Sequence, residues 1–173
     1  MEQEKNQETL SLIMTKGSLD SFYSCLVLAS TALAMDKKVT VFFAGNSIKC
    51  LYKNLNSLSL SPIESEGMVM KLAFGSAWVR KIDWNNLLPR CFWILPGARK
   101  LATSAFKKNL KIKNQPSIEE LREICIELGV SFVVCSMTLD LTGVDINSLI
   151  DNIEQAGAAS YFAETMPSQA LYI

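Results

Sequence analysis

The pattern that most restricts the fold lies near the start of the chain, where a helical segment separates two short apolar runs. The runs are Leu10 to Thr15 (LSLIMT) and Val39 to Ala44 (VTVFFA), and both have the length and composition of buried strands. Between them, Leu19 to Met35 carries apolar residues at helical spacing, after Ser18 as a candidate N-cap. Strand, helix and strand in this order form a βαβ unit, which needs a parallel strand pair and a right-handed crossover. The sequence therefore predicts an α/β protein with a mainly parallel sheet.

A second group of signals lies further along the chain. Ser117 and Glu120 form a capping box that predicts the start of a helix, and Gly129 supplies its end. The next apolar run, Phe132 to Val134, predicts a short buried strand that ends at Cys135. This order places a thiol at the point where a buried strand stops and the chain changes direction.

Weaker patterns outline the remaining elements. We expect helices at Ile48 to Leu55, Ala98 to Asn109, Ile146 to Ala156 and Ala158 to Met166, and a further strand at Cys91 to Leu95. Residues 1–8 and Pro167 to Ile173 are predicted to be tails. Residues 56–90 have no pattern that assigns them, and we interpret them as an insertion or a subunit-contact segment. Because no linker divides the chain, a single domain over residues 1–173 is predicted.

Composition argues against several classes of function. The chain has no histidine, which removes histidine-ligated metal sites and Ser-His or Cys-His catalytic pairs, and we expect neither a metal nor a cofactor. Seventeen basic and seventeen acidic residues cancel, so we expect no nucleic-acid partner. The five cysteines show no C-x-x-C spacing, which favours a reducing cytoplasm over a disulfide scaffold. We expect no signal peptide in the polar N-terminus and no transmembrane segment, because the apolar run near Cys25 to Met35 is too short to span a bilayer.

Cys135 is the candidate catalytic residue, because ligands of open parallel sheets bind at the carboxyl ends of the strands. The backbone N–H groups of Ser136 to Thr138 are expected to stabilise its thiolate, and Lys16 ends the first strand at the same edge. The alternative is that Cys135 is a small buried hydrophobic residue, as free cysteines often are. Cys25 and Cys125 lie on apolar helix stripes and are predicted to belong to the core.

Several neighbouring residues keep two interpretations. Gly17 either brings backbone N–H groups to an anion or is a turn glycine. Met137 either lines an apolar pocket or packs in the core, and Asp140 either orients the loop after Cys135 or is solvated. The basic stretch from Arg99 to Lys113 either docks an acidic protein or an anionic surface, or forms a solvated helix face.

The run Ser117 to Gly143, SIEELREICIELGVSFVVCSMTLDLTG, resembles the DsrE/DsrF-like sulfur-relay family, and within it the DsrE subgroup sometimes labelled peroxiredoxin-like. The segments Lys16-Gly17-x-x-Asp20, Leu95-Pro96-Gly97 and GAASYF are also similar to this family. The resemblance covers most of residues 10–165. It implies a flavodoxin-like or Rossmann-like three-layer sandwich that assembles into a homo-oligomer, as a trimer, tetramer or hexamer.

The resemblance also implies a function. The family's carrier cysteine corresponds to Cys135, which would accept sulfane sulfur as a persulfide or thiosulfonate and pass it to a partner thiol. The chain would then be a sulfurtransferase or a stoichiometric sulfur carrier, with TusA-like or rhodanese-like proteins as partners. The expected substrate-binding residues are Lys16, Gly17, Gly97, Ser136, Met137 and Thr138. Some relatives use a second cysteine shortly before the first, and the nearest here is Cys125, on an apolar stripe.

A second hypothesis comes from another class of protein. The chain would be a non-catalytic oligomeric module that binds a nucleotide, a flavin or an acyl ligand at the same sheet edge, because doubly wound sheets host many ligands. A peroxidase is a third hypothesis, suggested by the label of the subgroup, but the chain lacks the threonine- and arginine-assisted cysteine motif expected for it.

Overall fold

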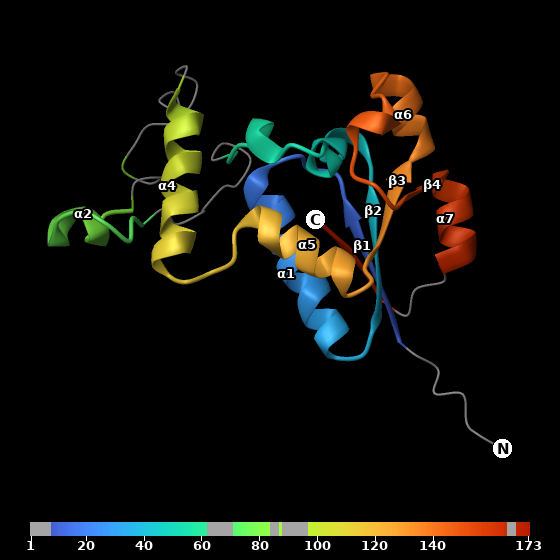
Figure 1. The fold of residues 1–173 in the computed structure, drawn as a ribbon, viewed down its shortest axis with the longest axis horizontal. Helices are drawn as coiled ribbons and strands as arrows, with labels where there is room; N and C mark the ends of the chain where they lie inside the picture. Colours follow the sequence, from blue (N-terminus) through green and yellow to red (C-terminus); the bar gives the residue numbers. More distant parts are fainter. Residues whose placement is uncertain (1–7, 62–70, 84–86, 88–96, 166–168) are drawn as a thin grey trace.

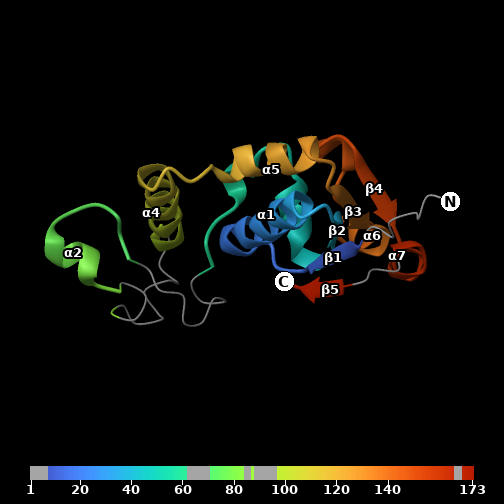
Figure 2. The ribbon, with the colours of Figure 1, turned by 90° about the horizontal axis from the view of Figure 1, so that it is seen from below.

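Five parallel strands form the centre of the molecule (Figures 1 and 2). The computed structural model describes residues 8–61, 71–83, 87, 97–165 and 169–173. The strands are β1 (Thr9–Met14), β2 (Lys38–Phe43), β3 (Ser131–Cys135), β4 (Ile153–Ala156) and β5 (Gln169–Tyr172). They lie in the order β4-β3-β2-β1-β5, and each neighbouring pair is parallel. The prediction of an α/β protein with a mainly parallel sheet is confirmed.

Helices lie on both faces of this sheet. Helices α1 (Leu19–Ala34) and α5 (Ile118–Glu127) pack together on one face, and α7 (Ala158–Thr165) lies on the other (Figure 1). Helix α6 (Ser136–Thr142) follows β3 directly, beyond the carboxyl end of the sheet. The change of face follows from crossover handedness. The β1-α1-β2 connection advances across the sheet in one direction and β4-α7-β5 in the other, so right-handed crossovers place α1 and α7 on opposite faces.

Alternating strand residues divide the core into two unequal clusters. The large cluster lies between the sheet and helices α1 and α5, and Phe43 at its centre meets Phe22 and Phe132 edge to face, with ring centroids 6.1 and 5.6 Å away. The small cluster lies under α7 and consists of Phe42, Val133, Cys135 and Tyr161. Cys135 therefore belongs to the less extensively covered face.

Helices α1, α4 (Ala98–Ile112) and α5 begin where the sequence predicts them. Helix α1 begins at Leu19 as expected, although the Ser18 hydroxyl donates to Ser21 Oγ (3.0 Å) and makes no capping bond. The capping box of α5 is present: Ser117 Oγ accepts from the Glu120 N–H (3.2 Å), and Glu120 Oε2 accepts from the Ser117 N–H (2.7 Å). Helix α4 extends the helix predicted there by three residues, from Asn109 to Ile112.

The prediction of one helix over Ile146 to Ala156 is wrong. This segment forms a 3-10 turn, η4 (Ile146–Ser148), and then the edge strand β4. Asn152 between them has φ +62°, which interrupts any helix. The Ile150 N–H donates to Leu51 O (2.8 Å), so pairing with a distant segment decides the conformation here.

The predicted C-terminal tail is also wrong for residues 169–172, which form β5 beside β1. The segment at Ile48 to Leu55 forms the 3-10 turns η1 (Gly45–Leu51) and η2 (Leu55–Ser57), not one α-helix. At the other end, Glu8 is no part of a frayed tail, because its carboxylate pairs with Lys37 Nζ at 2.8 Å. The strand predicted at Cys91 to Leu95 lies outside the described residues.

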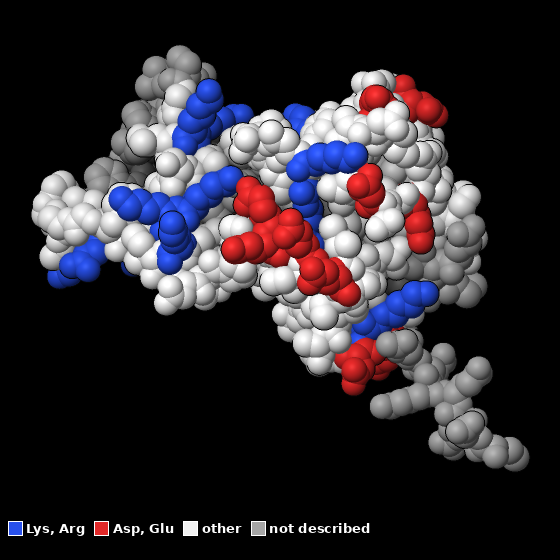
Figure 3. Space-filling model, in the orientation of Figure 1, with Lys and Arg blue, Asp and Glu red and all other residues white. Residues whose placement is uncertain are grey.

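Helices α2 (Ala77–Lys81) and α4 form an arm that extends beyond α1 and α5 (Figures 1 and 2). Lys107 Nζ pairs with Glu119 Oε1 (3.1 Å), and the Phe106 ring meets Tyr23 edge to face at 5.9 Å. Figure 3 shows basic side chains over α4 beside acidic side chains over α5, so opposite charges face each other where the arm meets α5. No described helix is long and apolar enough to cross a membrane.

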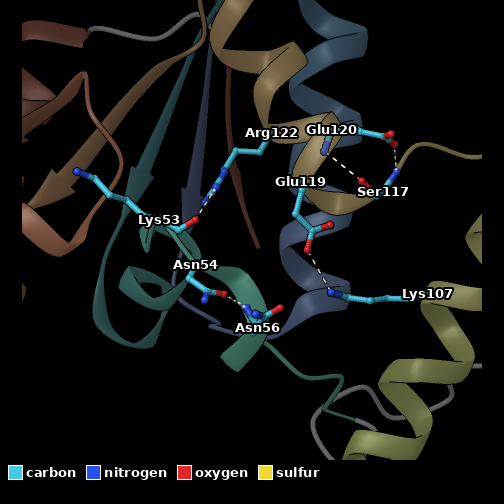
Figure 4. A network of polar contacts seen from close by, with 8 residues as sticks. All are labelled: Lys53, Asn54, Asn56, Lys107, Ser117, Glu119, Glu120 and Arg122. Carbon is cyan, nitrogen blue, oxygen red and sulfur yellow. Dashed lines mark hydrogen bonds and ion pairs between the residues drawn. The ribbon is translucent and has the colours of Figure 1, made fainter.

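Arg122 joins α5 to the loop that follows β2 (Figure 4). Its guanidinium is buried and donates to Tyr52 O (2.7 Å), Lys53 O (3.3 Å) and, at the limit of hydrogen bonding, Cys50 O (3.5 Å). Burial lowers the pKa of Arg122, while nearby Glu119 and Glu123 oppose that shift. One side chain thus satisfies the carbonyl groups at the end of η1 and fixes the path of this loop.

We predict that Arg122→Ala destabilises the fold by about 1–3 kcal/mol, because it leaves the partly buried carbonyl groups of Tyr52 and Lys53 without their donor. The urea midpoint should fall with little change in the slope of the transition. Glu127→Ala on the exposed side of α5 is the control and should change stability by less than about 0.5 kcal/mol. An Arg122→Ala midpoint equal to that of the control would contradict the assignment.

Three thiols of the large cluster are fully buried: Cys25, Cys50 and Cys125. Burial raises the pKa of Cys25 to about 12, with a further contribution from the neighbouring Cys125, and raises the pKa of Cys125 to about 11. Burial also raises the pKa of Cys50. The prediction that Cys25 and Cys125 are core residues is confirmed.

These raised pKa values predict that stability falls in alkaline solution. Above pH 9.0 the unfolded thiol of Cys25 loses its proton while the folded one keeps it, so the stabilisation is complete below that pH and disappears towards pH 12. Urea midpoints at about pH 8 and about pH 10.5 measure the fall, which should be smaller in Cys25→Ala. Equal falls in the variant and the parent protein would refute this linkage.

Candidate functional site

Three loops meet at the carboxyl end of the sheet. Gly17, after β1, lies so close to the loop after β2 that an added Cβ would be 2.1 Å from Asn46 O. The Gly45 N–H of that second loop donates to Thr138 Oγ1 (3.2 Å) on α6. The backbone of Gly17 thus allows a close approach that a side chain would prevent. These contacts bring the residues around Lys16, Gly45 and Cys135 to one edge.

Cys135 is the last residue of β3 and the N-cap of α6, with φ −68° and ψ 116°. The first N–H groups of a helix have no partner within the helix, and those of Ser136 to Thr138 follow the cysteine directly. The sulfur accepts no capping hydrogen bond from them. The thiol lies at the predicted position in the chain, without the predicted backbone donors.

The side chain of Cys135 is covered. It is only 7% exposed and packs with Phe42, Val133 and Tyr161. In this chain alone, the thiol is therefore less accessible than a thiol that reacts at the carboxyl edge needs to be. The physical reason is that α7 folds back over this face of the sheet and places Tyr161 in the small cluster.

Tyr161 is the residue of this site that the sequence argument missed. Its ring stacks on Phe42 with centroids 4.3 Å apart, and its hydroxyl shares a hydrogen bond with Ser11 Oγ. Burial raises the pKa of Tyr161, while the Ser11 hydrogen bond opposes that shift. The only sequence signal was the position of Tyr161 in the GAASYF segment, which gave it no role.

The other predicted site residues have different environments. Lys16 and Met137 are exposed, Ser136 is half-buried, and Thr138 is buried against the loop after β2. The high exposure of Met137, 75%, rules out core packing of its side chain in this chain alone. Gly97 is the N-cap of α4, with φ +99°, and α4 lies in the arm, on the far side of α1 and α5 from β3 (Figures 1 and 2). The structure does not bring Gly97 to this edge.

A cavity of about 280 Å³ lies on the same face as the small cluster. Thr9, Lys38 and Ser131, the first residues of their strands, line one part of it, and Val133, Ala156 and Tyr161 line another. Cys135 is not among the lining residues, although Val133 and Tyr161 contact it in the small cluster. The cavity thus lies towards the amino ends of the strands, and Val133 and Tyr161 stand between it and the thiol.

The sheet separates Cys135 from Cys125. Cys125 lies in the large cluster on the α1 and α5 face, where its thiol donates to Leu26 O at 3.5 Å, and Cys135 lies in the small cluster on the α7 face. Among the described residues, no three Cys, Asp or Glu side chains gather where they would hold a metal ion. Cys125 therefore does not face Cys135 in this chain.

Comparison with known proteins relates this chain to one protein family. Residues 6–171 match the model of the DsrE/DsrF/DrsH-like family. The chain is 39% identical over 156 residues to the sulfur carrier protein DsrE2 of Allochromatium vinosum, covering 90% of this chain and 91% of the relative. It is 29% identical over 154 residues to the uncharacterized protein YrkE of Bacillus subtilis, covering 89% of each.

A solved structure supports the same fold. The crystal structure of the ychN protein from E. coli superimposes with a TM-score of 0.50 and 13% sequence identity, covering 96% of this chain and 99% of that one. The match of the family model over nearly the whole sequence, together with the parallel sheet that ends β3 at Cys135, confirms the resemblance found in the sequence. The chain belongs to the DsrE/DsrF/DrsH-like family.

Proposed function

We propose that this protein is a sulfur carrier whose Cys135 accepts a sulfane sulfur and passes it to the thiol of a partner protein. The observation that carries the proposal is the position of Cys135 at the carboxyl end of a central parallel strand, the edge where such sheets bind ligands. The relative from A. vinosum, which is named a sulfur carrier, supports the same function.

The proposed transfer is an exchange between sulfurs. The Cys135 thiolate attacks the terminal sulfur of a donor persulfide, and a new sulfur–sulfur bond forms as the donor's own bond breaks. The bonding electrons leave with the donor thiolate, so Cys135 becomes a persulfide without an external oxidant or reductant. With thiosulfate as the donor, the leaving group is sulfite. A partner thiolate then attacks the terminal sulfur in the same way and regenerates the Cys135 thiolate.

Helix α6 supplies a surface on which a partner would dock beside Cys135. Met137 and Leu141 lie one turn apart on this helix and are 75% and 85% exposed. Lys16, also exposed, follows β1 at the same edge. A TusA-like carrier or a rhodanese-like sulfurtransferase is the proposed partner, and a cytoplasmic homo-oligomer is part of the same proposal.

We predict that the protein, incubated with thiosulfate or polysulfide under anaerobic conditions, gains mass as a sulfur adduct and that peptide mapping locates it on Cys135. The Cys135→Ser variant should lack this adduct. Cys50→Ala is the matched control, because the raised pKa of Cys50 keeps that thiol protonated and it should take no part. Equal adducts on the parent protein and on Cys135→Ser would end the proposal.

A further inference from the structure

Helix α7 covers Cys135, and among its described side chains one is buried against the sheet. Within residues 158–163, the part of α7 whose side chains the structure describes, Tyr161 alone is buried, at 2% exposure. The following residue, Phe162, is 53% exposed, and its ring meets the Tyr161 ring edge to face with centroids 5.5 Å apart. A helix with so few buried contacts opens at a lower free-energy cost than the core does.

The contacts of Tyr161 are specific to the closed position of the helix. The ring stacks on Phe42 of β2, and the hydroxyl bonds Ser11 Oγ of β1. Both partners belong to the sheet and are themselves buried, with exposures of 4% for Phe42 and 0% for Ser11. Outward movement of α7 therefore breaks one aromatic stack and one buried hydrogen bond together.

A cavity next to Tyr161 means that movement of α7 would change the access to Cys135. The cavity of about 280 Å³ has Val133, Ala156 and Tyr161 in its wall, and Val133 and Tyr161 also enclose the Cys135 side chain. Lys38, Glu154, Thr40 and Ser131 also line it, so its wall holds one basic and one acidic residue beside two hydroxyl-bearing residues. Withdrawal of the Tyr161 ring would join this polar cavity to the buried sulfur and open a path to it for a small polar sulfur donor.

We propose that α7 is a lid over Cys135 and that Tyr161, through its stack on Phe42 and its bond to Ser11, is the latch that sets how often the thiol is accessible. The proposal rests on the proposed function for its purpose, because a carrier thiol must be sheltered between transfers and reachable during them. Tyr161 packs beside Cys135 in the closed position and takes no part in the sulfur exchange, so it is a positioning residue.

The test is the rate at which iodoacetamide alkylates each cysteine, followed by peptide mass spectrometry on the full chain. Tyr161→Phe and Ser11→Ala each remove the latch hydrogen bond and keep the aromatic stack. We expect either variant to accelerate alkylation of Cys135 about two- to tenfold, the range that one net hydrogen bond supplies. Tyr172→Phe is the matched control, because Tyr172 also bonds a hydroxyl, Thr15 Oγ1 at 2.7 Å, but lies outside α7.

The core thiols Cys25, Cys50 and Cys125 report on the rest of the fold in the same samples. Faster alkylation of Cys135 alone supports a lid. Unchanged alkylation of Cys135 in both variants, equal acceleration of all four thiols, or the same acceleration in Tyr172→Phe would overturn it. The adduct experiment measures sulfur uptake separately. A sulfur adduct on Cys135 with no change of alkylation rate in the variants would refute the lid alone. Faster alkylation without any sulfur adduct would refute the sulfur carrier alone.

Discussion

The parallel pairing of β1 with both β2 and β5 is the constraint on which the rest of the structure depends. A parallel sheet must be covered on both faces, and its strands all end at one edge. Here the cover is unequal. Helices α1 and α5 bury one face in the large cluster, while α7 contributes one buried aromatic ring to the other. This inequality decides how accessible Cys135 is, because alternation along β3 turns its side chain towards the thinner cover.

Sequence reasoning succeeds where local chemistry decides the structure. Three patterns predict their conformation from residues close together in the sequence: the βαβ pattern, the capping box at Ser117 and the apolar run that ends at Cys135. It fails where a distant partner decides. β4 and β5 are short, and most of their residues are exposed, so neither carries the pattern of a buried strand. The cover over Cys135 depends on Tyr161, Phe42 and Ser11, which are far apart in the sequence, and no local pattern predicts their contact.

The candidate site also shows how the scaffold fixes loops that have little secondary structure. Arg122 satisfies the carbonyl groups at the end of η1, and the beginning of the same turn packs against Gly17 and Thr138. The loop after β2 is thus held at both ends, once by a buried cation from α5 and once by close backbone packing. A side chain that never approaches Cys135 therefore contributes to the shape of the edge where Cys135 lies.

The location of the thiols on opposite faces of the sheet has a consequence for the lifetime of a bound sulfur. A persulfide is lost as sulfide when a second thiol of the same protein attacks it and closes an internal disulfide. The described core thiols Cys25, Cys50 and Cys125 all lie beyond the sheet from Cys135, so a sheet of paired backbone stands in the way of that attack. If Cys135 carries sulfur as proposed, the sheet would shield its persulfide from the described core thiols, and release would then depend on the thiolate of another protein.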